Sequence, residues 1–219
     1  MKIYGFSGRN KLNWTNLESG ECGVVDVPYQ NIDISNVDIL NGKLFLATRT
    51  KQETINNDNL VIFDLKENRI ENIIELGEVT RTLPIDNERV LFISRYGTNS
   101  CLEIYNISNN TRKELIKYES PYKEKGDPRR EIWELNQFNN REKIYYWEIN
   151  IDKLYVKVAA INGMELEESI IVYEMDFDSK GSSPIPNVTI SKDEMEMIIY
   201  NYNIETDSIE KFSMVKLNK

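Results

Sequence analysis

The chain has 219 residues, 40% of them hydrophobic and 10% aromatic, and it carries a formal net charge of −9. This composition can bury a substantial core, which argues against a disordered chain. The acidic balance argues against nucleic acid as a partner, because phosphate contacts require clustered Lys and Arg.

The absence of histidine restricts the chemistry further. It excludes catalytic arrangements that use a histidine base and metal sites with histidine ligands. Any chemistry would have to use carboxylates, Lys, Tyr, Arg or an oxygen-ligated metal, and no metal or other cofactor is expected. The N-terminal residues show no signal-peptide pattern and no run reaches the length of a membrane span, so we expect a cytoplasmic protein without a membrane partner. Cys22 and Cys101 are expected to be free thiols, with a disulfide as the alternative.

The first elements expected along the chain are short strands. Residues 2–6 are expected to form a strand, and 13–17 and 22–27 a hairpin. The segment 32–76 contains four apolar runs that end in turn residues, and its β-branched and aromatic residues favour strands over helix. Asn41-Gly42 between two of these runs predicts a tight hairpin turn, because both positions of a type I′ turn need positive φ.

The segment 32–76 recurs later in the chain. Partial copies occupy 79–118 and 143–176. The first copy keeps offsets of 46 and 42 from the reference segment, and the second aligns 147–158 with 37–48 at an offset of 110. Four strands in about 45 residues is the size of one propeller blade. Such recurrence predicts a repeat architecture.

The C-terminal part continues the pattern, with strands expected at 188–191, 195–204 and 209–215. Together these units resemble the β-propeller repeat superfamily, which includes WD-repeat and Kelch-like bladed proteins. The resemblance implies an all-β fold, a small β-propeller of four to five blades made of four-stranded antiparallel units. An open β-meander or a sandwich is the alternative.

Residues 119–141 interrupt the repeat and are interpreted as an insertion in a single domain that spans 1–219. They combine aromatic, Arg and Lys side chains, a mixture that is enriched at protein interfaces. The alternative is a loop that only covers the blade rims. The candidate partner-binding residues of the insertion are Tyr122, Arg129, Arg130 and Trp133.

Two further pairs occupy equivalent repeat positions. Arg49 and Arg95 end the same strand in successive units, which makes them candidates for an anion contact or, alternatively, solvent-facing charges. Asp38 and Glu148 are matched in the same way. Two carboxylates at a suitable separation can hydrolyse a glycosidic bond without histidine. Solvated acids lining a channel are the alternative.

These features predict a non-enzymatic protein-binding module that presents propeller rim loops to a partner protein, including a basic one. No catalytic residue is assigned. The alternative is a carboxylate-based carbohydrate-binding protein or a glycoside hydrolase that works without histidine. Self-association is a third option.

Overall fold

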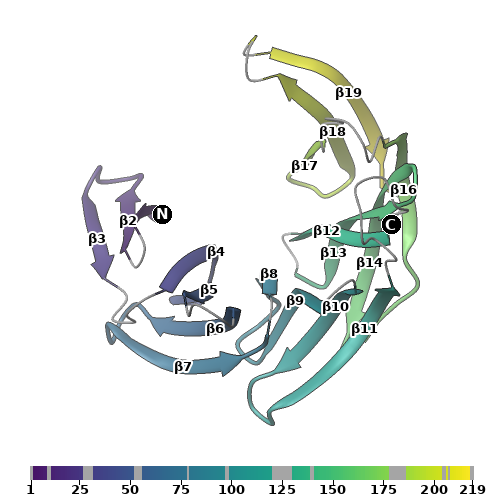
Figure 1. The fold of residues 1–219 in the computed structure, drawn as a ribbon. Helices are drawn as coiled ribbons and strands as arrows, with labels where there is room; N and C mark the ends of the chain where they lie inside the picture. Colours follow the sequence, from purple (N-terminus) through teal and green to yellow (C-terminus); the bar gives the residue numbers. More distant parts are fainter. Residues whose placement is uncertain are drawn as a thin grey trace. The chain divides into compact units, whose positions relative to one another are not determined.

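The computed structural model describes residues 2–8, 11–26, 32–51, 56–77, 79–96, 99–119, 130–138, 141–177, 186–203, 206 and 208–217. All regular structure in these ranges is β-strand (Figure 1). They contain no helix, and therefore none long and apolar enough to cross a membrane. The chain divides into two compact units. Unit 1 comprises Met1–Tyr96 and Glu103–Arg112, and unit 2 comprises Gly97–Leu102 and Lys113–Lys219.

The described strands form five separate sheets in chain order. The first contains β1 (Lys2–Gly8), β2 (Lys11–Asn16) and β3 (Cys22–Asp26). The second contains β4 (Ile32–Leu40), β5 (Lys43–Lys51), β6 (Asn56–Asp64) and β7 (Arg69–Glu75). The third contains β8 (Val79–Pro84), β9 (Arg89–Tyr96), β10 (Asn99–Asn106) and β11 (Thr111–Glu119). The fourth contains β12 (Arg130–Gln137), β13 (Lys143–Asn150), β14 (Lys153–Asn162), the short β15 (Glu165–Leu166) and β16 (Ile170–Asp176). The fifth contains β17 (Asn187–Ile190), β18 (Glu196–Asn203) and β19 (Ser208–Lys216).

The strand order confirms most of the predicted repeat. The reference segment 32–76 holds β4–β7, and the copy at 79–118 holds β8–β11. The offset of 110 is wrong by one strand. Residues 147–158 lie in the second and third strands of their sheet, whereas 37–48 lie in the first and second. Hairpins with the same alternation look alike wherever they stand in a sheet, so the pattern does not encode a strand's place.

The central strands of unit 1 are apolar on both faces because a core lies against each face. Phe45 and Ala47 of β5 belong to one buried cluster, together with side chains of β9. Leu44 and Leu46, which alternate with them, belong to a second cluster that contains Leu12 of β2. Successive side chains of a strand point to opposite faces, so this continuous apolar run serves two cores at once.

Unit 2 has a core of its own, to which the fourth and fifth sheets both contribute. Trp147, Leu154 and Val156 come from the fourth sheet, and Met197 and Ile199 come from the fifth. All five side chains are at most 3% exposed. The shared core holds the two sheets of this unit against each other.

The predicted insertion at 119–141 is narrower in the structure. Glu119 ends β11, and residues 130–137 form β12, which pairs with β13 as a regular member of the fourth sheet. Residues 120–129 lie outside the described residues. The extent of the domain, 1–219, stays a prediction. Cys22 and Cys101 are both free thiols, as expected.

Candidate functional site

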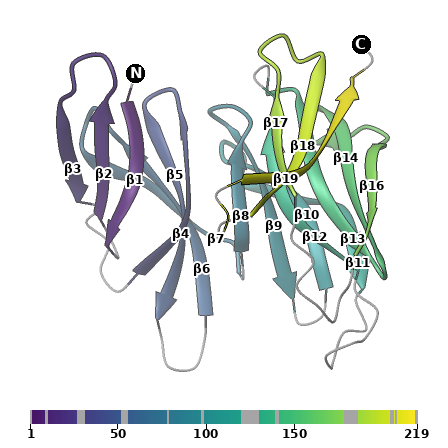
Figure 2. The ribbon, with the colours of Figure 1, turned by 90° about the horizontal axis from the view of Figure 1, so that it is seen from above.

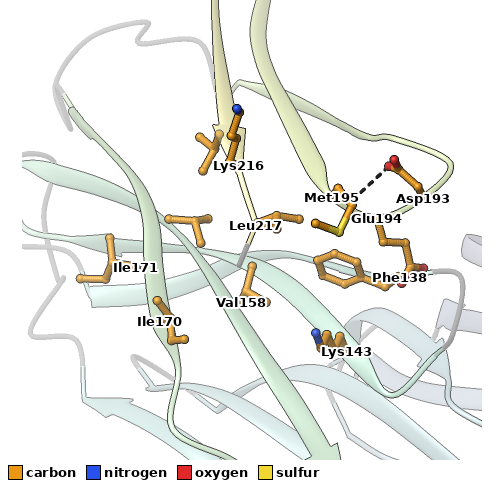
Figure 3. Close-up of a pocket in the computed structure, with 12 residues that line it drawn as sticks. Phe138, Lys143, Val158, Ile170, Ile171, Asp193, Glu194, Met195, Lys216 and Leu217 are labelled. Atoms are coloured by element: carbon orange, nitrogen blue, oxygen red, sulfur yellow. Dashed lines mark hydrogen bonds between the residues drawn. The ribbon is translucent and has the colours of Figure 1, made fainter. Parts of the chain in front are cut away.

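A pocket of about 430 Å³ opens in unit 2 beside the core that the fourth and fifth sheets share (Figure 3). Eight of its twelve lining side chains are apolar, among them Phe138, Val158, Met195 and Leu217. The remaining four are charged. A mainly apolar cavity of this size with a few charged groups has the composition of a ligand-binding site.

One wall of the pocket is the beginning of β16, a strand at the edge of its sheet. In the described part of the chain β16 pairs with β14 alone, along which it runs in Figure 2. Ile170 pairs with Val158, and Ile171 pairs with Lys157. Ile170 is 67% exposed and Ile171 is 52% exposed, although both line the pocket. The edge therefore presents two adjacent apolar side chains to solvent next to an apolar cavity.

The charged groups of the pocket differ in how they are engaged. Asp193 accepts hydrogen bonds from Ser191 Oγ at 2.7 Å and from the Met195 backbone N–H at 3.1 Å, and these bonds lower the pKa of its carboxyl group. Glu194 also has an interaction partner within the chain. Among the described residues, no ion pair or side-chain hydrogen bond involves Lys143 or Lys216. The two ammonium groups are therefore the available charges.

A buried ionic cluster surrounds Glu148 of the fourth sheet, with Tyr118 contributed by β11 of the third sheet. Glu148 is 4% exposed, and its Oε2 accepts hydrogen bonds from Tyr118 Oη and Lys157 Nζ, each at 2.5 Å. Burial, and then the Glu148 carboxylate, raise the pKa of the Tyr118 phenol. Because Glu148 Oε2 accepts from both an ammonium group and a hydroxyl, its contacts are those of a structural ion pair. Asp38 of unit 1 is half-buried and accepts a hydrogen bond from the Ile39 N–H at 2.8 Å.

The predicted binding residues are distributed over several elements. Arg130 is the exposed first residue of β12, and Trp133 is half-buried and packs against the core of unit 2. Arg95 lies half-buried in β9. Arg49 belongs to β5, but its side chain is outside the described residues, as are Tyr122 and Arg129 altogether. Neither Arg130 nor Trp133 lines the pocket, so the proposed binding role of all six residues stays a prediction.

Sequence reasoning missed the pocket residues Lys143, Ile170 and Ile171. The signal for the last two was present, since they form an isoleucine pair after the polar residues 167–169. Its meaning depends on β16 being an edge strand, and the order of strands in a sheet is not encoded in alternation. Lys143 begins a strand that is otherwise buried, and nothing local distinguishes it from other strand-end lysines.

Comparison with known proteins yields similarity at the level of structure alone. No protein-family model matches the sequence, and no curated protein matches it. The β-propeller domain of the Trilobed protease from Pyrococcus furiosus is 10% identical with a TM-score of 0.57, over 86% of this chain and 56% of that one. An oligogalacturonate lyase in complex with manganese is 12% identical with a TM-score of 0.63, over 94% and 57%. A chain of a nidogen/laminin complex is 11% identical with a TM-score of 0.59, over 91% and 69%.

These likenesses establish the fold. The chain is an all-β protein of the β-propeller class, built from four-stranded antiparallel units, and its five described sheets agree with the predicted four to five blades. It spans little more than half the length of the first two structures, 56% and 57%.

The expectation of a non-enzymatic protein is contradicted by the comparisons. The structures that share this fold include an oligogalacturonate lyase and a domain of a protease. The fold therefore gives no support to an assignment as a non-enzyme. The sequence argument relied on the missing histidine, which excludes particular mechanisms and not catalysis as such.

Proposed function

We propose that the chain is a protein-binding module that takes an extended segment of its partner along the free edge of β16. The observation that carries the proposal is the pair Ile170 and Ile171, exposed on an edge strand beside an apolar pocket. Proteins usually protect sheet edges with charges, prolines or bulges, because an open edge pairs with other chains. An added strand would gain main-chain hydrogen bonds from the edge and side-chain specificity from the pocket.

The charges at the other end of β16 favour a basic partner. Glu174 and Asp176 have side chains that are 49% and 93% exposed, and both bind Lys153 Nζ, at 3.1 Å and 2.6 Å. The two exposed carboxylates on this strand offer contacts to cationic side chains of a partner. The net charge of −9 acts in the same direction over longer distances, where it raises the association rate of a cationic partner.

The test uses a displayed library of random short peptides, selected against the full chain. Affinities of the selected peptides are then measured by fluorescence anisotropy. Replacing both isoleucines, Ile170→Lys with Ile171→Lys, is expected to weaken binding by more than about tenfold, because apolar contact is lost and the edge becomes charged. Circular dichroism confirms that the variant is folded.

The matched control is Ile73→Lys. Ile73 is 42% exposed and belongs to β7, the edge strand of a sheet in unit 1. This change should leave peptide affinity within about twofold of the unsubstituted chain. Failure to select any peptide, or an equal loss of affinity in the Ile73→Lys control, would refute the proposed function.

A further inference from the structure

We infer that the bound segment is the carboxyl-terminal end of the partner, with its last apolar side chain in the pocket and its α-carboxylate on Lys143. This inference rests on the proposed strand addition at β16. Three features of unit 2 carry it: the direction of β16 relative to the pocket, the position of Lys143 in the sheet, and the charges that are free to pair.

The direction of β16 places one end of an added strand at the pocket. Ile170, Ile171 and Val172, the first residues of β16, line the pocket, whereas Glu174 and Asp176 at its other end do not. In the fourth and fifth sheets, the strand pairs β12–β13, β13–β14, β14–β16, β17–β18 and β18–β19 are all antiparallel. An antiparallel strand on the free edge would end where β16 begins. Its C-terminal residues would therefore reach the pocket.

Lys143 lies on β13, two strands across the same sheet from β16, and also lines the pocket. Tyr145 pairs with Val158, and Val158 pairs with Ile170. Lys143 lies two residues before Tyr145 on β13, hence on the same face of the sheet, and pairs with Ala160. Measured along the strands, Lys143 lies two residues past the level of Ile170, with β14 between β13 and β16. Because Lys143 and Ile170 line the same pocket, a chain end that turns from the added strand into the pocket would meet the Lys143 ammonium group.

The available charges select a carboxylate. The pocket acids are already engaged within the chain, whereas Lys143 and Lys216 are in no ion pair or side-chain hydrogen bond with any described residue. Figure 3 shows the apolar side chains of Val158 and Leu217 between these two lysines. An ammonium group at the rim of an apolar cavity binds a carboxylate by a charge-assisted hydrogen bond. A parallel strand would instead bring an α-ammonium group to this cationic rim.

The experiment compares two matched peptide libraries against the full chain. In one, each random peptide is anchored through its N-terminus and ends in a free α-carboxylate. In the other, the same peptides are anchored through their C-terminus. The tightest peptide is then synthesised as the free acid and as the C-terminal amide. We expect the acid to bind about tenfold more tightly than the amide.

The lysine variants locate the carboxylate. Lys143→Gln should bring the affinities of the acid and the amide peptide to within about twofold of each other, while Lys216→Gln should preserve most of the difference. Equal binding of acid and amide to the unsubstituted chain would overturn the inference and leave strand addition standing. Loss of the ratio in Lys216→Gln and not in Lys143→Gln would also overturn it. Absence of binders in both libraries would refute the proposed function itself.

Hexanoate provides a third arm, because it has an apolar chain and a carboxylate but no backbone to pair with β16. It should compete only at concentrations far above the dissociation constant of the peptide. Competition at equal concentrations would overturn the inference, since a fatty-acid-like ligand would then suffice for the site.

Discussion

The sheet formed by β4–β7 and the sheet formed by β12–β16 are both antiparallel, but the side chains exposed on their outer strands differ. The outer strand β7 exposes three charged residues, Arg69, Glu71 and Glu75, beside a single exposed isoleucine, Ile73. The outer strand β16 begins with the exposed pair Ile170 and Ile171. Charges on an edge strand discourage pairing with other chains. The β7 edge is therefore protected by charges, whereas the beginning of the β16 edge is open.

The interiors of these two sheets differ in a related way. In each sheet, the second strand buries one polar side chain, Thr48 in β5 and Glu148 in β13. Each pairs with a residue of the first strand at which the pairing register shifts, Ile34 and Ile132 respectively. Thr48 Oγ1 donates a neutral hydrogen bond to the Asn59 carbonyl at 3.2 Å. Glu148 is instead ionic. At the corresponding described position, the fourth sheet therefore buries a charge pair, whereas the second sheet buries a neutral hydrogen bond.

The largest expected effect comes from breaking that pair. Lys157→Met should destabilise the protein by about 3 kcal/mol, because it leaves the buried Glu148 carboxylate without its cation. The corresponding change in the other sheet, Thr48→Val, should cost about 1 kcal/mol, since only a neutral hydrogen bond is lost. Urea denaturation of both variants measures the two values. Equal costs would mean that the two interiors do not differ as described.

Alkaline pH should reduce the stability of the protein through a tyrosine of the fourth sheet, and the sheet formed by β4–β7 has no such group. Burial, with a smaller contribution from Glu134, raises the pKa of the Tyr145 phenol to about 12. A raised folded-state pKa contributes stability that is present below about pH 10 and lost as pH rises through 12. No tyrosine occurs in residues 32–76.

Tyr145→Phe should therefore reduce the loss of stability between about pH 9 and pH 12 by roughly 2 kcal/mol. The measurement is urea denaturation at both pH values. An unchanged alkaline slope would show that the Tyr145 phenol does not titrate with folding.

The smallest expected effect concerns the hairpin turns. Asn41 and Gly42 have φ values of 50° and 78°, whereas the turn between β13 and β14 places Ile151 at 62°. A β-branched residue rarely adopts this conformation, and Ile151 is 45% exposed, so packing does not require it. Ile151→Asn should stabilise the protein by about 1 kcal/mol, and Asn41→Ile should destabilise it by a similar amount. Thermal unfolding of the two variants in parallel tests the pair.

Much of the fold could be predicted from sequence because its signals are local. The Asn41-Gly42 turn, the continuous apolar runs and the spacing of segment 32–76 all depend on neighbouring residues, and the structure confirms them. The pocket could not be predicted, because Ile170 and Leu217 join the Phe138–Lys143 hairpin only through strand order and sheet packing. For the same reason, the predicted alignment at an offset of 110 matched strands that differ by one place in their sheets.

The central claim, that β16 is a docking edge, is tested most directly by hydrogen exchange with a selected peptide bound. Backbone amides of an edge strand exchange slowly once a new strand accepts their hydrogen bonds. We predict slower exchange in β16, over Ile170–Asp176, and unchanged exchange in β7, over Arg69–Glu75. Unchanged exchange in β16 with the peptide bound, or equal slowing in both strands, would contradict the account.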